Sequence, residues 1–218
     1  RLKRIAKETK VSLAIGIVLL VLFFVSMVGF ALESRHQIDC TMYLNQYRLG
    51  SKALTTAVRS YAVTGSRQYY DAYKQELEVD KNRDTAWAGL EANNLTAKEW
   101  EVLNEIASLS NGLVPLEESA MDSVSAGDLQ SATDYVFGET YNSTVTTISD
   151  LTDSLILEVQ DRLKVRKNVM LALQTICAVL FLLGFIKMAG QCTKTVGFAN
   201  RELLVPIVKV SEQMKVLA

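Results

Sequence analysis

The stretch VSLAIGIVLLVLFFVSMVGFAL, residues 11–32, contains no charged side chain. A helix of this length spans about 33 Å at a rise of about 1.5 Å per residue, which is enough to cross the hydrocarbon core of a bilayer. A second uncharged stretch, VMLALQTICAVLFLLGFI at residues 169–186, spans about 27 Å as a helix. This second helix is long enough to cross the bilayer core if it continues to residue 190. Lys187 would then extend its charged end towards the headgroups. The sequence therefore predicts two transmembrane helices in a lipid bilayer, at residues 11–32 and 169–190.

Charge is distributed unevenly around these two stretches. Residues 1–10 carry a net charge of +4, residues 33–168 carry −8 and residues 187–218 carry +3. Basic flanks mark the cytoplasmic side of a membrane, so we expect residues 1–10 and 191–218 inside the cell and residues 33–168 outside it. A basic cluster at residues 162–167 lies on the outer side and opposes this assignment, but the first helix usually sets the orientation. An acidic outer segment gives no indication of nucleic-acid binding.

The sequence lacks the residue patterns of catalytic, cofactor and metal sites. It contains no nucleophile elbow, phosphate-binding glycine loop or HExxH motif. Its three cysteines include no CxxC pair, and its single histidine, His36, stands apart from them. We therefore expect neither a metal site nor an enzymatic activity within residues 1–218. Cys40 is the only cysteine of the outer segment. It is either a small apolar side chain or one half of a disulfide across a dimer.

The outer segment begins with a long amphipathic helix. On a wheel of about 100° per residue, the apolar side chains between residues 33 and 63 occupy an arc of about 200°. This predicted buried face consists of Ile38, Met42, Tyr43, Tyr47, Leu49, Ala53, Leu54, Ala57, Val58 and Tyr61. The opposite polar stripe contains Gln37, Thr41, Arg48, Lys52, Thr55 and Arg59. No helix breaker separates this helix from the first apolar stretch, so we expect the two to form one rod.

Turn and capping signals divide the rest of the outer segment into three more helices. Thr64-Gly65-Ser66 ends the first helix, and we expect Ser66 to cap a second helix that runs from residue 67 to about 91. Thr96 and Glu99 have the spacing of a capping box for a third helix, which should kink near Asn111 because of Pro115. Gly127-Asp128 should cap the fourth helix. Short turns between long helices predict an all-α, up-down-up-down four-helix bundle flanked by the two spans.

Beyond the second span, apolar residues repeat with the spacing of a coiled-coil seam. Pro206 opens the segment, and Ile207, Val210, Met214 and Leu217 follow at intervals of three, four and three. With Arg201 and Ala218, these residues resemble the first helix of a HAMP domain, the parallel coiled-coil relay of bacterial receptors. The segment between Lys187 and Val205 is longer than the usual join in that family. A seam of this kind cannot bury itself in one chain, so we expect a parallel homodimer.

The outer segment is also similar to four-helix-bundle sensor domains of methyl-accepting chemotaxis receptors. The resemblance lies in the stretch AVRSYAVTG at residues 57–65 with Tyr69, Tyr70 and Tyr73, and in residues 116–128. It implies a protein of the bacterial inner membrane that relays an extracellular signal through HAMP to an output module beyond Ala218. Relatives of these sensors occur in histidine kinases and diguanylate cyclases, which is the alternative. A third interpretation is a structural anchor with two membrane spans, but such an anchor has no need of a coiled-coil seam after Pro206.

Three basic residues of the first outer helix form a candidate ligand site. Arg48, Lys52 and Arg59 lie within about 40° of one another on the helical wheel. The resemblance implies a small carboxylate ligand bound between two subunits by arginines of this helix, and only Arg59 stands near a matching position. The competing interpretation is a solvated polar stripe.

Overall fold

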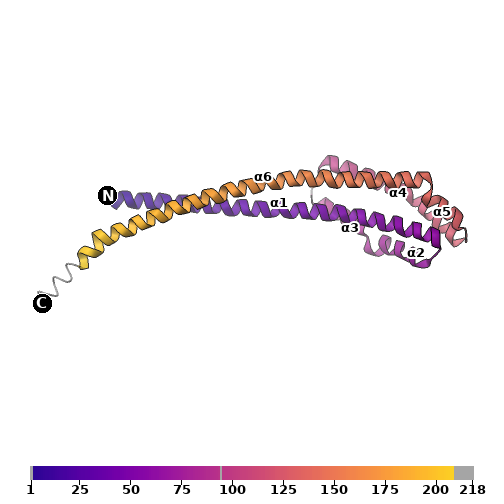
Figure 1. Ribbon diagram of the computed structural model, residues 1–218, viewed down its shortest axis with the longest axis horizontal. Helices are drawn as coiled ribbons and strands as arrows, with labels where there is room; N and C mark the ends of the chain where they lie inside the picture. Colours follow the sequence, from indigo (N-terminus) through magenta and orange to yellow (C-terminus); the bar gives the residue numbers. More distant parts are fainter. Residues whose placement is uncertain (1, 94, 209–218) are drawn as a thin grey trace. The chain divides into compact units, whose positions relative to one another are not determined.

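The computed structural model describes residues 2–93 and 95–208. Within these residues all the regular structure is helical and there is no strand, which confirms the predicted all-α class. The elements, six α-helices and two π-helices (Figure 1), are α1 (Leu2–Thr64), α2 (Arg67–Lys74), η1 (Gln75–Asp80), α3 (Asn82–Ala92), α4 (Ala97–Ser125), α5 (Leu129–Phe137), α6 (Glu139–Ala199) and η2 (Asn200–Leu204).

The chain divides into two compact units. We call residues 1–33 and 167–218 the apolar unit and residues 34–166 the core unit. Helices α1 and α6 each contribute one part to both units, whereas α2, η1, α3, α4 and α5 belong to the core unit alone.

The apolar unit contains the parts of α1 and α6 that are long and apolar enough to cross a membrane, judged by length and composition. Most of their large apolar side chains are exposed. The two helices contact each other through stacked rings, since the centroids of Phe23 and Phe181 lie 5.8 Å apart. A Cβ atom at Gly184 would stand 2.6 Å from the Cδ1 atom of Leu19, so a larger residue there would require the end of the Leu19 side chain to move. Small residues commonly allow such close approaches between membrane helices.

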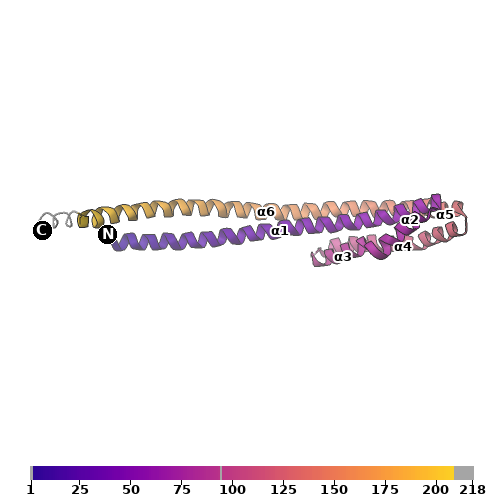
Figure 2. The same ribbon diagram turned by 90° about the horizontal axis from the view of Figure 1, so that it is seen from below.

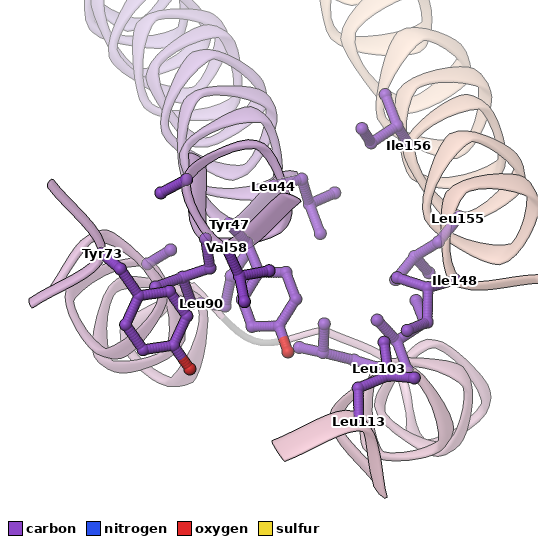
Figure 3. Close-up of a cluster of buried hydrophobic side chains, with 14 of the residues drawn as sticks. Leu44, Tyr47, Val58, Tyr73, Leu90, Leu103, Leu113, Ile148, Leu155 and Ile156 are labelled. Carbon is purple, nitrogen blue, oxygen red and sulfur yellow. The ribbon is translucent and has the colours of Figure 1, made fainter. Parts of the chain in front are cut away.

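The core unit is organised around one cluster of buried side chains from all of its α-helices. Figure 3 shows Leu44, Tyr47 and Val58 of α1 facing Leu103 and Leu113 of α4 and Leu155 of α6. Pairwise contacts connect the helices around this cluster. The Trp87 ring of α3 lies between Tyr47 of α1, at 6.5 Å, and Trp100 of α4, at 5.2 Å between centroids. In both ribbon views α1 and α6 run side by side along the core unit (Figures 1 and 2).

The predicted buried face of α1 is only partly correct. Tyr47, Leu54, Ala57 and Val58 are buried in the core, as expected. By contrast, Ile38, Met42 and Leu49 are 63%, 48% and 62% exposed, and Ala53 is exposed as well. The apolar arc of α1 is wider than the surface that the other helices of the same chain cover. An apolar stripe therefore remains uncovered on α1, formed by Ile38, Met42, Leu49 and Ala53.

Most of the predicted helix ends are confirmed. Gly65 follows α1 with φ at 62°, and Gly127 follows α4 with φ at 83°, conformations that glycine adopts without steric cost. Thr96 and Glu99 form the capping box at the start of α4, and the Asp128 side chain accepts a hydrogen bond from the Ser131 N–H. The prediction for Ser66 is wrong, because its side chain forms no cap; its backbone N–H instead donates to the Thr64 hydroxyl.

The predicted second helix is divided into α2, η1 and α3. The break occurs at Lys81, which adopts a left-handed conformation with φ at 46°. A buried carboxylate stabilises the new helix start: Glu76 accepts hydrogen bonds from the Asn82 N–H, at 3.1 Å, and from the Asn82 side-chain amide, at 2.7 Å. Gln46 of α1 in turn donates to the Asn82 side-chain oxygen. The break is held by tertiary contacts that a helical pattern does not reveal.

The predicted fourth helix is likewise divided, into α5 and α6 at Gly138. A Cβ atom at this position would stand 2.6 Å from the Asp134 carbonyl oxygen, which explains the glycine. Helix α4, in contrast, continues through Asn111, Gly112 and Pro115.

The C-terminal segment is helical as far as it is described. The π-helix η2 precedes Pro206, which has no N–H to donate to the Glu202 carbonyl four residues earlier. Pro206 and Ile207 lie in a helical turn. The other predicted seam residues, Val210, Met214 and Leu217, lie outside the described residues.

Candidate functional site

A cavity of about 400 Å³ lies inside the core unit. Small-molecule sites in proteins have volumes of roughly 300–1,000 Å³, so the cavity is large enough for a small ligand. Side chains of α1, α2, η1, α3, α4 and α6 line it. Its charged lining residues are five bases, Arg48, Lys52, Arg59, Lys81 and Arg83, and three acids, Glu76, Asp84 and Glu117.

All three basic residues singled out in the sequence line this cavity, but they differ in their contacts. Arg48 is held by neighbours on two helices: it forms an ion pair of 3.0 Å with Asp153 of α6 and donates to the Asn45 side-chain oxygen at 2.6 Å. These contacts occupy its guanidinium group and connect α1 with α6.

Arg59 is even more firmly positioned. Its Nε atom donates to the Val136 carbonyl oxygen at 3.0 Å, and its Nη2 atom donates to the Asn142 side-chain oxygen at 2.6 Å. The guanidinium carbon also lies 5.1 Å from the centroid of Phe137 and 5.2 Å from that of Tyr141. Arg59 therefore fastens the joint between α5 and α6 to α1.

Lys52 stands between these two arginines in the sequence and is exposed. Its ammonium group forms no hydrogen bond or ion pair within the described part of the chain. Of the three predicted residues, Lys52 is the one whose charge is available to a ligand.

The structure adds two basic residues that the helical wheel did not indicate, Lys81 and Arg83. Lys81 is the left-handed residue at the break, and its ammonium group, like that of Lys52, forms no hydrogen bond or ion pair to a described residue. Arg83 lies over the Tyr47 ring at 5.4 Å, and its buried Nε atom has no acceptor among the described residues. The sequence signal for Lys81 and Arg83 is the polar run DKNRD at residues 80–84, in the middle of a predicted helix.

A buried carboxylate in the cavity lining, that of Glu117, connects three helices. Glu117 of α4 accepts hydrogen bonds of 2.7 Å from the hydroxyl groups of Tyr73 of α2 and Tyr141 of α6. Burial raises the pKa of both tyrosines above the ordinary value, and the nearby Glu117 carboxylate raises it further. Each oxygen of Glu117 thus has one tyrosine donor.

A second buried carboxylate, Glu99, connects α4 with α6. Arg162 donates to both of its oxygens, at 2.7 and 2.9 Å, and the Thr96 N–H donates to one of them at 2.7 Å. Burial alone would raise the pKa of Glu99, but the hydrogen bonds from Arg162 and Thr96 outweigh it and hold the pKa below its ordinary value. The pair lies outside the cavity and has a structural role.

The described residues contain no cluster of three or more His, Cys, Asp or Glu side chains that could hold a metal ion. No family model, curated protein or solved structure matches this chain.

Proposed function

We propose that the chain is the sensory and transmembrane part of a bacterial chemoreceptor-type signal transducer. The observation that carries this proposal is the course of α1 and α6. Each is a single helix with a membrane-length apolar segment in one unit and side chains that line the cavity in the other. A ligand that fills the cavity contacts the same two helices that enter the membrane.

The proposed topology places residues 11–32 and 169–190 in the cytoplasmic membrane and both chain ends inside the cell. The core unit then lies outside the cell as a four-helix bundle in which α2, η1 and α3 together form the second column, and α5 with the core part of α6 forms the fourth. Contacts between α1 and α3, α3 and α4, α4 and α6, and α6 and α1 support this arrangement. The basic ends of the chain support the orientation.

The proposed active form is a parallel homodimer. Support comes from the uncovered apolar stripe on α1, since Ile38, Met42 and Leu49 are spaced by four and seven residues as in a helix–helix seam. The seam that begins at Ile207 gives the cytoplasmic end of the same interface. Cys40 is buried and its Sγ atom lies 3.7 Å from the Asn93 carbonyl oxygen, which argues against a disulfide between two chains.

A hybrid receptor tests this function. Residues 1–218 are fused to the signalling half of a known chemoreceptor, and the activity of its coupled kinase is measured in membranes with a panel of amino acids and small organic acids. We expect at least one compound to change the kinase activity. The proposal is contradicted if a hybrid that inserts and folds shows the same kinase activity with every compound and also shows no change when α6 is interrupted beyond Ala189.

A further inference from the structure

We propose that the cavity of the core unit binds a small multivalent anion within a single protomer, with Lys52, Lys81 and Arg83 as the charge-bearing contacts. This inference rests on the proposed sensory function and deepens it, because it names the chemical class of the ligand. It also moves the binding site from the surface between two subunits into one chain.

The charge of the lining is the first argument. Five basic and three acidic side chains leave an excess of positive charge around one cavity of about 400 Å³. Like charges that share a partly enclosed space repel one another, and this repulsion is relieved when an anion enters. Neutral and cationic ligands offer no such relief.

The second argument is that the cations differ in availability. Arg48 and Arg59 are occupied by Asp153 and by Val136 and Asn142, so they position helices and contribute charge only from a distance. Lys52 and Lys81 are exposed, and their ammonium groups have no hydrogen-bonding partner among the described residues, which leaves all three N–H donors of each ammonium group for a ligand.

The third argument concerns Arg83. Its buried Nε atom lacks an acceptor among the described residues, and an unpaired donor on a buried charged group is costly. Its side chain is held against Tyr47, because its Nη2 atom donates to the Tyr47 hydroxyl at 3.5 Å and its guanidinium carbon lies 5.4 Å from the centroid of the Tyr47 ring. A planar guanidinium held in this way can bind a carboxylate or a phosphate through two parallel hydrogen bonds.

The remaining lining defines the ligand further. Ser110 and Asn111 of α4 and Ser149 of α6 also line the cavity and offer neutral donors. Three available cations favour a ligand with two or more negative charges, and the volume restricts it to a small molecule. Carboxylates and phosphates share this chemistry, so both are used as probes.

Isothermal titration calorimetry of the full chain in nanodiscs of zwitterionic lipid tests the proposal. Citrate, inorganic phosphate and pyrophosphate are the anionic probes, and glycerol is the neutral control. We expect citrate or one of the phosphates to bind at one molecule per chain, weakening with added salt, and glycerol to give no signal. Citrate alone identifies a carboxylate site, and phosphate or pyrophosphate alone identifies a phosphate site; both support the proposal.

Matched substitutions locate the site. Lys52→Gln and Arg83→Gln should each weaken binding about tenfold, the typical effect of losing a charge-assisted hydrogen bond. Lys81→Asn should weaken binding to the same extent, and asparagine adopts the left-handed backbone conformation of this position more readily than most residues. Arg67→Gln and Lys98→Gln remove exposed charges outside the cavity and should leave the affinity unchanged. Circular dichroism confirms that each variant is folded.

Three results overturn the inference: no binding of any anion, equal losses in the cavity and control variants, or one anion per two chains. Its failure is separable from that of the proposed function. An anion that binds to the chain but leaves the hybrid kinase unchanged contradicts the sensory function alone. A hybrid that responds to other compounds without anion binding contradicts the cavity site alone.

Discussion

At the scale of single residues, Glu99 combines two structural roles. Its carboxylate caps the N-terminus of α4 and forms a doubly hydrogen-bonded pair with Arg162 of α6. The Glu99 side chain is only 2% exposed, and that of Arg162 is 24% exposed. Removing one partner of such a pair leaves the other charge poorly solvated, so the pair is sensitive to both substitution and pH.

We expect Glu99→Gln to lower the free energy of unfolding of the core unit by about 2–4 kcal/mol at neutral pH. The pKa of Glu99 is lower in the folded chain than its ordinary value of 4.5. The stability that it contributes is therefore present above a pH of about 4.5 and is lost as the pH falls through the lowered pKa. Thermal unfolding followed by the fluorescence of Trp87 and Trp100 measures this effect.

The difference between the wild-type chain and Glu99→Gln should shrink between pH 7 and pH 3. Lys98→Gln, which breaks the neighbouring exposed pair with Glu158, should have little effect at either pH. A Glu99→Gln difference that is equally large at both pH values would show that the ionised carboxylate is not the source of the stability.

At the scale of the elements, glycine residues that look alike in the sequence have opposite roles. Gly138 separates α5 from α6, and a Cβ atom there would meet the Asp134 carbonyl oxygen at 2.6 Å. Gly112 lies exposed inside α4, and nothing stands within 4 Å of a Cβ atom at that position. The first glycine is required by a backbone contact, whereas the second only weakens a helix.

Alanine at these two positions should therefore change stability in opposite directions. Gly138→Ala should destabilise the core unit by about 1–3 kcal/mol, because backbone must shift to accept the methyl group. Gly112→Ala should stabilise it by about 0.5–1 kcal/mol through helix propensity. Chemical denaturation with the same fluorescence readout compares them, and a gain from Gly138→Ala would contradict the role assigned to that contact.

The elements also show what the sequence can and cannot predict. Local signals predicted the ends of α1 and α4 and the start of α5, because Gly65, Gly127 and Asp128 act on neighbouring backbone groups. The break at Lys81 depends on Glu76, Asn82 and Gln46, which meet only in the folded chain. For the same reason the wheel placed Lys52 correctly on the polar stripe but could not indicate that Lys81 and Arg83 share its cavity.

At the scale of the whole molecule, α1 carries both the interior contacts of the core unit and an uncovered apolar stripe. Four apolar residues, Ile38, Met42, Leu49 and Ala53, remain exposed although the rest of the same arc is buried. In the proposed receptor this stripe is covered by a second copy of α1.

Leu49→Glu should convert the proposed dimer to a monomer, because it places a charge in the middle of this stripe. Val79→Glu is the matched control, since Val79 of η1 is 66% exposed but does not belong to the apolar stripe of α1. Size-exclusion chromatography with light scattering in detergent measures the mass. A dimer that persists in Leu49→Glu would exclude the α1 stripe as the interface.

Inserting two glycines between Ala189 and Gln191 should uncouple the core unit from the output of the hybrid receptor. The insertion lies within α6 and outside the core unit, so thermal unfolding of the core unit should be unchanged. Two alanines at the same place keep the helix but turn the following residues by about 200°, so they should change the resting kinase activity and preserve a response. A glycine variant that responds like the parent hybrid would contradict transmission through α6.

Because of the π-helix η1, the number of residues between Gln75 and Asp80 helps to determine which side chains line the cavity. A turn of this kind accommodates about one residue more than an α-helical turn. Losing one residue of this turn, such as Val79, would break the five-residue spacing that places the Lys81 N–H nitrogen 2.9 Å from the Glu76 carbonyl oxygen, and would thereby move Lys81 and Arg83 relative to the residues before them. No substitution at these two positions has that effect. Two natural variants with identical cavity residues but different lengths between Gln75 and Asp80 should thus recognise different ligands, so that specificity in this protein can diverge by deletion as well as by replacement.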